Sequence, residues 1–156
     1  MIQNLGTVIY WYNGQIKRIK LGRMGHAGLH DIAIDPTRGL AYVSSWGRIG
    51  SYVAVLMQVE FVTALHVGLD PRTVVYDATH DYVYVASRLG HSLAVIRDTQ
   101  VISNIEVRGN AMGLGVDETG GYIYLASPDS HNITIFGFAE EIKQHSFWDF
   151  LPWINR

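Results

Sequence analysis

The chain has 156 residues, 48% of them hydrophobic and 17% charged, a balance typical of a folded domain and not of a disordered chain. Its formal net charge is −2 and its 12 Lys and Arg residues form no run, which excludes the basic patch that nucleic acids or anionic membranes attract. Because the chain contains no cysteine, disulfides, thiol catalysis and cysteine-bound zinc are excluded as well.

The first predicted element is a pair of strands within residues 5–22, in the segment TVIYWYNGQIKRIKL. β-branched and aromatic residues dominate this segment, as they do in strands. The two strands resemble the third and fourth strands of the unit that the rest of the chain repeats. We therefore expect a partial unit at this end.

A repeat begins at residue 31, and three positions recur in it with spacings of 42 and then 40 residues. They hold an aspartate (Asp35, Asp77, Asp117), a tyrosine (Tyr42, Tyr84, Tyr124) and a serine (Ser45, Ser87, Ser127). Segments such as LAYVSS, YVYVAS and YIYLAS alternate with period two, which indicates half-buried strands. Four short strands in about 40 residues match the size and content of a β-propeller blade.

The sequence therefore predicts an all-β, propeller-like fold without helices before residue 138. Full blades are expected at residues 31–68 and 73–108, and a partial blade of three strands at residues 113–137. The aspartates are expected to be structural, because an Asp followed two residues later by Thr suits a turn in which the carboxylate caps its own backbone. A catalytic residue would rarely be needed three times at equivalent positions.

The repeated unit resembles the YVTN-type repeat, a close relative of the NHL-type repeat. In that family a strand ending in Asp leads through a glycine-containing turn to a Tyr-Val strand. The matching residues are Asp35, Gly39, Tyr42 and Val43, then Asp77, Tyr84 and Val85, then Asp117, Gly120, Tyr124 and Leu125. The turn at His80-Asp81 lacks the glycine, and Leu125 stands where the family usually has valine. The resemblance covers residues 5–137 and implies an architecture, not an activity.

Two, four, four and three predicted strands give 13, a little over three blades of four strands. Propellers close with about four to eight blades, so the chain cannot close a ring by itself. We favour a dimer in which two copies join head to tail into a ring of about six blades. The alternative is that the chain is a segment of a larger propeller, natural or dissected. In the dimer, a junction blade would hold five strands, one too many.

Residues 138–156 do not continue the repeat. Their sequence is helix-like at first and then rich in aromatic residues. The interface candidates there are Phe147, Trp148, Phe150 and Trp153. One interpretation is a helix that packs across its own propeller, and the other is an anchor for another subunit or protein. A membrane-surface role is least favoured, because the segment carries little basic charge.

The resemblance implies that ligand sites lie on one face, among the loops between second and third strands and between blades. The candidate ligand-binding residues on these loops are Trp46, Arg48, Arg72, Arg88 and His26, beside His30 and Asp70. The arginines suit a small anion, although single surface arginines are commoner. His91 and His131, 40 residues apart, are candidates for acid/base catalysis or for hydrogen bonds to a neighbouring blade. Their spacing matches no compact metal motif, and we expect no metal or cofactor.

We expect a non-enzymatic scaffold or binding module that self-associates. The alternative is a lactonase- or lyase-like enzyme that uses His91 or His131 on a small anionic substrate held by Arg72 or Arg88. No nucleophile elbow, P-loop, Rossmann glycine pattern or HExxH motif is present. The sequence shows neither a secretion signal nor an apolar run of roughly 20 residues, so a cytoplasmic protein without a membrane span is expected.

Overall fold

The computed structural model describes residues 7–21, 28–47 and 50–137. This part consists of thirteen β-strands and one short 3₁₀ helix, which confirms the all-β prediction. The 3₁₀ helix η1 (Pro128–Ser130) is the one departure from an all-strand reading, and Pro128 favours it because the pyrrolidine ring fixes a helical φ. The predicted tail helix and its aromatic residues lie outside the described residues.

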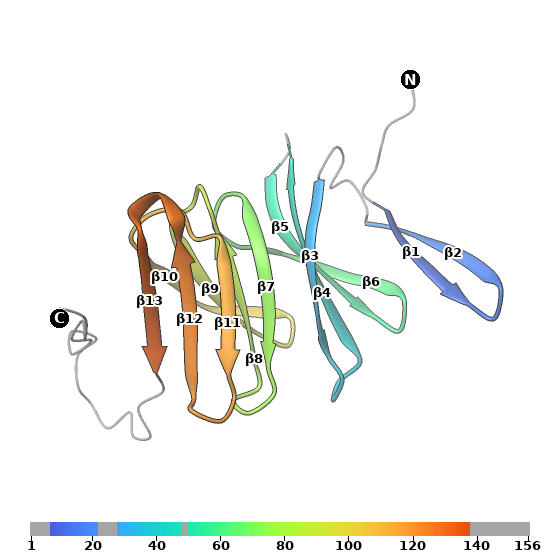
Figure 1. Ribbon diagram of the computed structural model, residues 1–156. Coiled ribbons are helices and arrows are strands. Elements are labelled where there is room, and N and C mark those ends of the chain that lie inside the picture. Colours follow the sequence, from blue (N-terminus) through green and yellow to red (C-terminus); the bar gives the residue numbers. More distant parts are fainter. Residues whose placement is uncertain (1–6, 22–27, 48–49, 138–156) are drawn as a thin grey trace.

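The strands form a hairpin and three antiparallel sheets, each in simple chain order (Figure 1). The N-terminal hairpin comprises β1 (Thr7–Tyr12) and β2 (Gln15–Lys20). The first blade comprises β3 (Gly28–Asp35), β4 (Leu40–Gly47), β5 (Gly50–Met57) and β6 (Glu60–His66). The second comprises β7 (Pro71–Asp77), β8 (Tyr82–Ser87), β9 (Ser92–Arg97) and β10 (Gln100–Glu106). The third has β11 (Gly113–Asp117), β12 (Tyr122–Ser127) and β13 (Asn132–Gly137).

The repeated aspartates close the turn between the first two strands of each blade. Asp35 Oδ1 accepts hydrogen bonds from the backbone N–H groups of Thr37 and Arg38, at 2.9 and 3.1 Å. Asp77 and Asp117 accept the equivalent pairs of bonds two and three residues further along the chain. The structural role predicted for these aspartates is therefore confirmed, and each carboxylate satisfies turn N–H groups that would otherwise lack partners.

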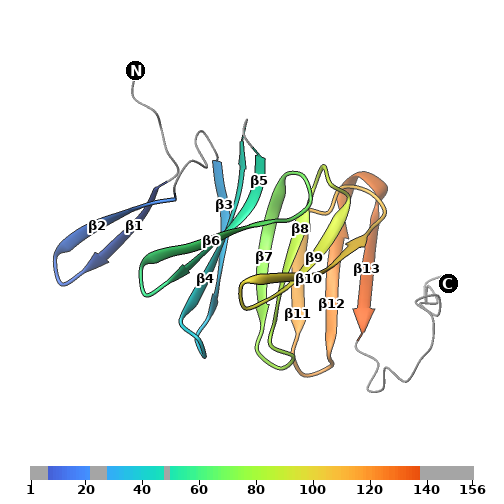
Figure 2. The ribbon, with the colours of Figure 1, turned by 180° about the vertical axis from the view of Figure 1, so that it is seen from behind.

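The blades stack face to face in the order hairpin, first, second, third (Figures 1 and 2). Between the first and second blades, buried side chains such as Tyr42, Val55, Val85 and Ile96 form one hydrophobic cluster. Between the second and third blades a second cluster gathers Tyr84, Leu93, Val95, Ile123 and Leu125, among others. Full burial of side chains of this size contributes about 1.5–3 kcal/mol each, so these clusters hold the blades together.

The hairpin covers only part of the first blade. Ile19 of β2 and Leu21 pack on Val43, Ala54 and Leu56, the residues of the strands β4 and β5 that face away from the second blade. The inner strand β3 has no such cover, because its Ile32 and Ile34 are 51% and 52% exposed. Beside them lies an apolar recess of about 320 Å³, which is also lined by Ile9 and Ile19. We call Ile32, Ile34 and this recess the N-terminal face.

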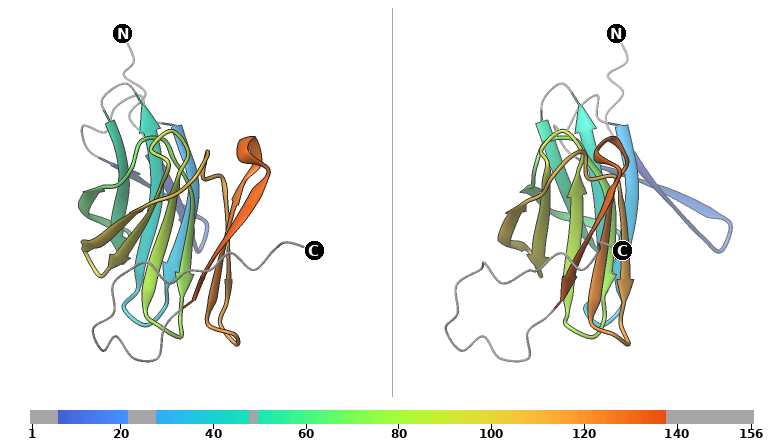
Figure 3. Two further views of the ribbon diagram at one scale, coloured as in Figure 1. Left: turned by 90° about the vertical axis from the view of Figure 1, so that its left-hand side faces the viewer. Right: turned by 60° about the vertical axis from the view of Figure 1, so that its left-hand side comes forward.

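Among the described residues, none covers the outer side of the third blade. The repeated tyrosine is 1% exposed as Tyr42 and 2% exposed as Tyr84, but 39% exposed as Tyr124. The left view of Figure 3 looks onto this blade, and no other described strand lies in front of it. We call its exposed residues Tyr122, Tyr124, Ile133 and Ile135 the C-terminal face. The described blades therefore form an open array and not a closed ring.

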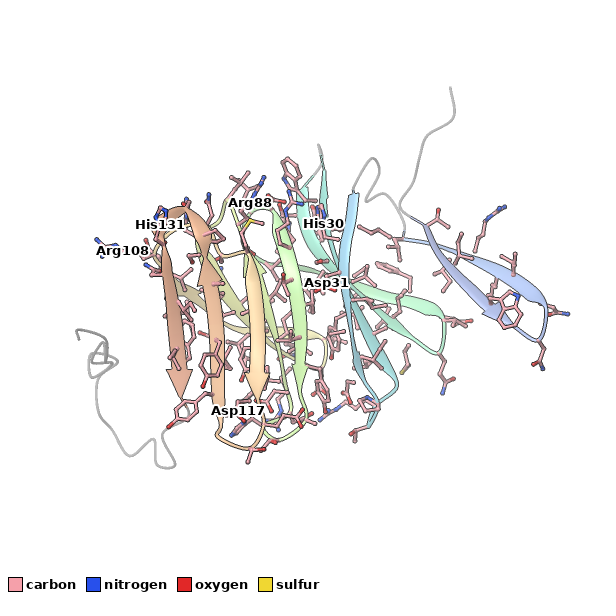
Figure 4. The ribbon with its side chains drawn as sticks, in the orientation of Figure 1. His30, Asp31, Arg88, Arg108, Asp117 and His131 are labelled. Carbon is pink, nitrogen blue, oxygen red and sulfur yellow. The ribbon has the colours of Figure 1, made fainter. Side chains whose placement is uncertain are left out.

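The blades have two distinct ends. The aspartate-capped turns lie at one, the turn end, where Figure 4 labels Asp117. The links between blades and the β8–β9 and β12–β13 connections lie at the other, the loop end, where Figure 4 labels His30, Arg88, Arg108 and His131. The described part of the chain contains no helix with the length and apolarity that crossing a bilayer requires.

Candidate functional site

A buried aspartate organises the loop end between the first and second blades. Asp70 lies in the link between β6 and β7, and none of its side chain is exposed. Its backbone N–H donates to Ser51 Oγ at 3.1 Å, and its carbonyl accepts from the N–H of Arg88 at 2.9 Å. The backbone of Asp70 adopts a left-handed φ of 58°, which aspartate tolerates better than most residues. Hydrogen bonds to β5 and to the β8–β9 connection thus fix the backbone of Asp70.

Two arginines and a histidine surround the Asp70 carboxylate. Arg88 Nε lies 2.6 Å from Oδ2, and Arg72 Nε lies 3.0 Å from Oδ1. His30 Nε2 is 3.9 Å from Oδ1, and its Nδ1 lies 3.3 Å from Arg72 Nη1. The three surrounding side chains come from the start of β3, the start of β7 and the β8–β9 connection. We call these four residues the Asp70 cluster.

The cluster carries more positive than negative charge. Burial, followed by the charge of Arg72, lowers the pKa of His30 below its ordinary 6.5, so the imidazole is neutral at pH 7. Two guanidinium groups therefore share a single carboxylate, which leaves a net charge of about +1 by the usual protonation states. The side chains of Arg72 and Arg88 remain 27% and 31% exposed, so this excess charge can be reached from solvent.

The structure brings together two of the five candidate ligand-binding residues, Arg72 and Arg88. Trp46 pairs with Gly28 across β3 and β4 at the same end, and it is half-buried. His26 and Arg48 lie outside the described residues. The sequence placed Asp70 and His30 on the loop face but gave no sign that they meet the arginines. A signal was available, since the residues 42 before and 40 after Asp70 are Gly28 and Asn110, so Asp70 departs from the repeat.

His91 and His131, the two candidate catalytic histidines, lie in equivalent turns of the second and third blades and are not part of the Asp70 cluster. His91 has a φ of 46° and His131 a φ of 52°, and the N–H of each points to the carbonyl three residues earlier. His91 Nδ1 lies 2.9 Å from the carbonyl oxygen of Gly109, in the link to the third blade. This contact is the hydrogen bond to a neighbouring blade that one interpretation of the sequence expected.

The described residues form no set of metal ligands. Among residues 7–21, 28–47 and 50–137, no group of three or more His, Cys, Asp or Glu side chains lies where it could hold a metal ion. The Asp70 cluster contains one carboxylate and two arginines, and cations such as arginine repel a metal ion. The arrangement is suited instead to a negatively charged group.

Comparison with known proteins supports the fold and no activity. No family model and no curated protein matches the chain. A crystal structure of a candidate 6-phosphogluconolactonase from Bacteroides uniformis is 14% identical, with a TM-score of 0.60 over 74% of this chain and 38% of that one. A chain of the nidogen/laminin complex is 17% identical, with a TM-score of 0.59 over 80% of this chain and 48% of that one. The chain therefore spans less than half the length of these two propeller-like structures.

Proposed function

We propose that the chain is a non-enzymatic propeller scaffold that binds a second copy of itself head to tail and so completes a ring. One observation carries the proposal: both bare faces are repeat counterparts of faces that the chain already covers. Tyr124 of the C-terminal face corresponds to Tyr42 and Tyr84, which the following blade buries to 1% and 2% exposure. Apolar faces of this kind are normally covered in a native assembly.

The N-terminal face has covered counterparts too. Ile32 and Ile34 correspond, 42 residues later, to Val74 and Tyr76, which pack on the first blade. Ile19 of β2 corresponds to Ile105 of β10, so the hairpin already supports the first blade as an outer strand does. The described residues supply no inner strands at this end of the array, and the recess beside Ile32 and Ile34 lies where such strands would pack.

The third blade of a second copy offers such inner strands. Its β11 and β12 would cover Ile32 and Ile34, and the same contact repeated by two-fold symmetry would close the ring. In each junction blade, β13 of one copy and β1 of the other would both occupy the position of the third strand. The junction blade would therefore hold five strands, one too many, as the sequence analysis expected. One of the two must shift outward in the closed ring.

The test is the mass of the chain in solution, measured by light scattering on a sizing column across a dilution series. The monomer is 17.5 kDa, and we expect a stable species of twice that mass. A monomer at all concentrations would overturn the proposal.

Single variants on each face test which surfaces meet. Tyr124→Asp and Ile34→Asp should each give monomers, because a carboxylate would be buried in an apolar contact. Ile102→Asp is the matched control, since Ile102 is 49% exposed on the outer strand β10, away from both faces. A mixture of the two monomeric variants should recover a heterodimer, because one of its two junctions joins the unchanged N-terminal face of the Tyr124→Asp chain to the unchanged C-terminal face of the Ile34→Asp chain. A mixture that stays monomeric contradicts head-to-tail association.

The aromatic tail is a separate candidate for the contact, through Phe147, Trp148, Phe150 and Trp153. Deleting residues 138–156 should leave the dimer intact if the sheet faces close the ring. Loss of the dimer on deletion, with the dimer of Tyr124→Asp retained, would assign the contact to the tail instead.

A lactonase- or lyase-like enzyme is the second candidate function. The paired Arg72 and Arg88 favour it, because they suit a small anionic substrate, and one structural neighbour carries a lactonase name. A screen of lactones against the purified chain decides between the two functions. Turnover that Arg88→Gln abolishes would favour the enzyme, whereas no turnover by a folded dimer favours the scaffold.

A further inference from the structure

We infer that the Asp70 cluster is a binding site for a small oxyanion, a carboxylate or a phosphate group, held by Arg72 and Arg88 with His30 beside them. The inference does not depend on ring closure, because all four residues come from one chain. It follows from the geometry of the arginines, their uncompensated charge and the uniqueness of the cluster.

The arginines present unused donors. Each guanidinium turns its Nε toward Asp70, at 3.0 Å for Arg72 and 2.6 Å for Arg88, and both Nε atoms are buried. A guanidinium has five N–H donors. One on Nη1 of Arg72 lies against His30 Nδ1 at 3.3 Å, so three remain on Nη1 and Nη2 of Arg72 and four on those of Arg88 for other acceptors. With roughly 30% of each side chain exposed, these are the atoms that a ligand can reach.

No other carboxylate among the described residues forms an ion pair with either arginine. Asp31, the neighbour of His30 in the sequence, is engaged elsewhere, because its Oδ1 accepts from the N–H of Ile32 and its Oδ2 from the N–H of Val74. Two guanidinium groups face one buried carboxylate, so one positive charge has no described carboxylate to balance it. An oxyanion that bridges the two arginines supplies the balancing negative charge, and it can accept charge-assisted hydrogen bonds from both.

The cluster is pre-formed for this task. The buried Asp70 carboxylate orients both arginines, and hydrogen bonds at 3.1 and 2.9 Å fix its own backbone. Its repeat counterparts Gly28 and Asn110 carry no charge, and those of Arg72 are His30 and Met112. The blade fold therefore forms without such a cluster at the other positions, which argues that it serves a purpose beyond the fold. Figure 4 shows His30 and Arg88 at the loop end that other connections share.

The test titrates the full chain with inorganic phosphate and, separately, with acetate, and follows the His30 ring by NMR. The resonance is assigned with the His30→Gln variant. Bound anion adds negative charge next to His30, whose charged neighbours are Arg72, Asp70 and Arg88, so its pKa should rise from the lowered value. A response to phosphate alone identifies a phosphate site, and a response to acetate alone identifies a carboxylate site.

Three variants make the result specific. Arg88→Gln and Arg72→Gln should each weaken binding about tenfold or more, because each removes a charged hydrogen-bonding group. Arg108→Gln is the matched control, since Arg108 is an exposed arginine at the same end without contact to Asp70. Each variant is first shown to be folded by its circular dichroism spectrum. The inference is overturned if neither anion moves the His30 resonance, or if Arg108→Gln weakens binding as much as Arg88→Gln does.

Discussion

The two ends of the blades carry charge clusters of opposite composition. At the turn end, Arg38 lies among three carboxylates, with Asp35 at 2.9 Å and both Asp81 and Asp98 at 2.5 Å. At the loop end, Asp70 lies between two guanidinium groups. The first cluster ties the first blade to the second and compensates its cation fully. The second leaves positive charge without a partner and open to solvent.

The two clusters also differ in whether their aspartate belongs to the repeat. Asp35 belongs to the repeated aspartates, whose backbone hydrogen bonds recur in all three described blades. Asp70 occurs once. In a protein built from repeats, a residue that every unit keeps serves the unit, and a polar residue that departs from the pattern is a candidate for function. Changes at the turn end should therefore act on stability, and changes at the loop end on binding.

The largest effect is expected at a repeated aspartate. Asp77 is 1% exposed, accepts two backbone hydrogen bonds and lies 2.7 Å from His80 Nδ1. Asp77→Ala should lower the free energy of unfolding by about 2–3 kcal/mol, because it leaves turn donors without an acceptor. Urea denaturation at a fixed protein concentration measures this. Asp117→Ala is the control, since its turn is more exposed and water can replace the carboxylate. Equal losses in both variants would contradict burial as the cause.

A smaller stability effect is expected for Asp70. Asp70→Asn removes the charge that two arginines share but keeps the size of the side chain. Because those arginines stay about one-third exposed and hydrated, the loss should be about 1–2 kcal/mol and not that of a fully buried ion pair. Asp129→Asn, at the same end and exposed, should change stability by less than about 0.5 kcal/mol. A loss for Asp70→Asn as large as that for Asp77→Ala would make the cluster a structural element and weaken the contrast between the ends.

The contrast also explains what the sequence could predict. Strands and aspartate turns depend on neighbours a few residues apart, so the repeat of Asp35, Asp77 and Asp117 revealed both. The exposure of Tyr124 depends on which blade follows, and the predicted strand count already implied a missing neighbour. The Asp70 cluster depends on residues from two strands of different blades, β3 and β7, and from two connections. The spacing of the repeat predicts that Arg72 and Arg88 lie on the loop face of the blades, but it does not predict that Asp70 is buried between them.

The smallest and most specific expected effect is on how the stability of the chain depends on pH, through Arg38 and Asp81 at the turn end. The hydrogen bond from Arg38 is the main reason that the pKa of Asp81 falls from 3.8 to about 2. A carboxylate with a lowered folded-state pKa adds stability above its unfolded value, and this contribution disappears as pH falls through the folded value. Arg38→Gln should therefore destabilise the chain most above about pH 4, and its difference from the unchanged chain should shrink toward pH 2.

Urea midpoints between pH 6 and pH 2 measure that difference. Arg97→Gln is the control, because Arg97 Nη2 lies 3.5 Å from Asp81 and affects its pKa less than Arg38 does. A pH-independent difference for Arg38→Gln would show that Arg38 acts through packing, and not by holding Asp81 ionised. The same urea midpoints for Arg88→Gln give the profile at the loop end, so the two profiles compare an arginine among three carboxylates with one of two arginines that share a single carboxylate.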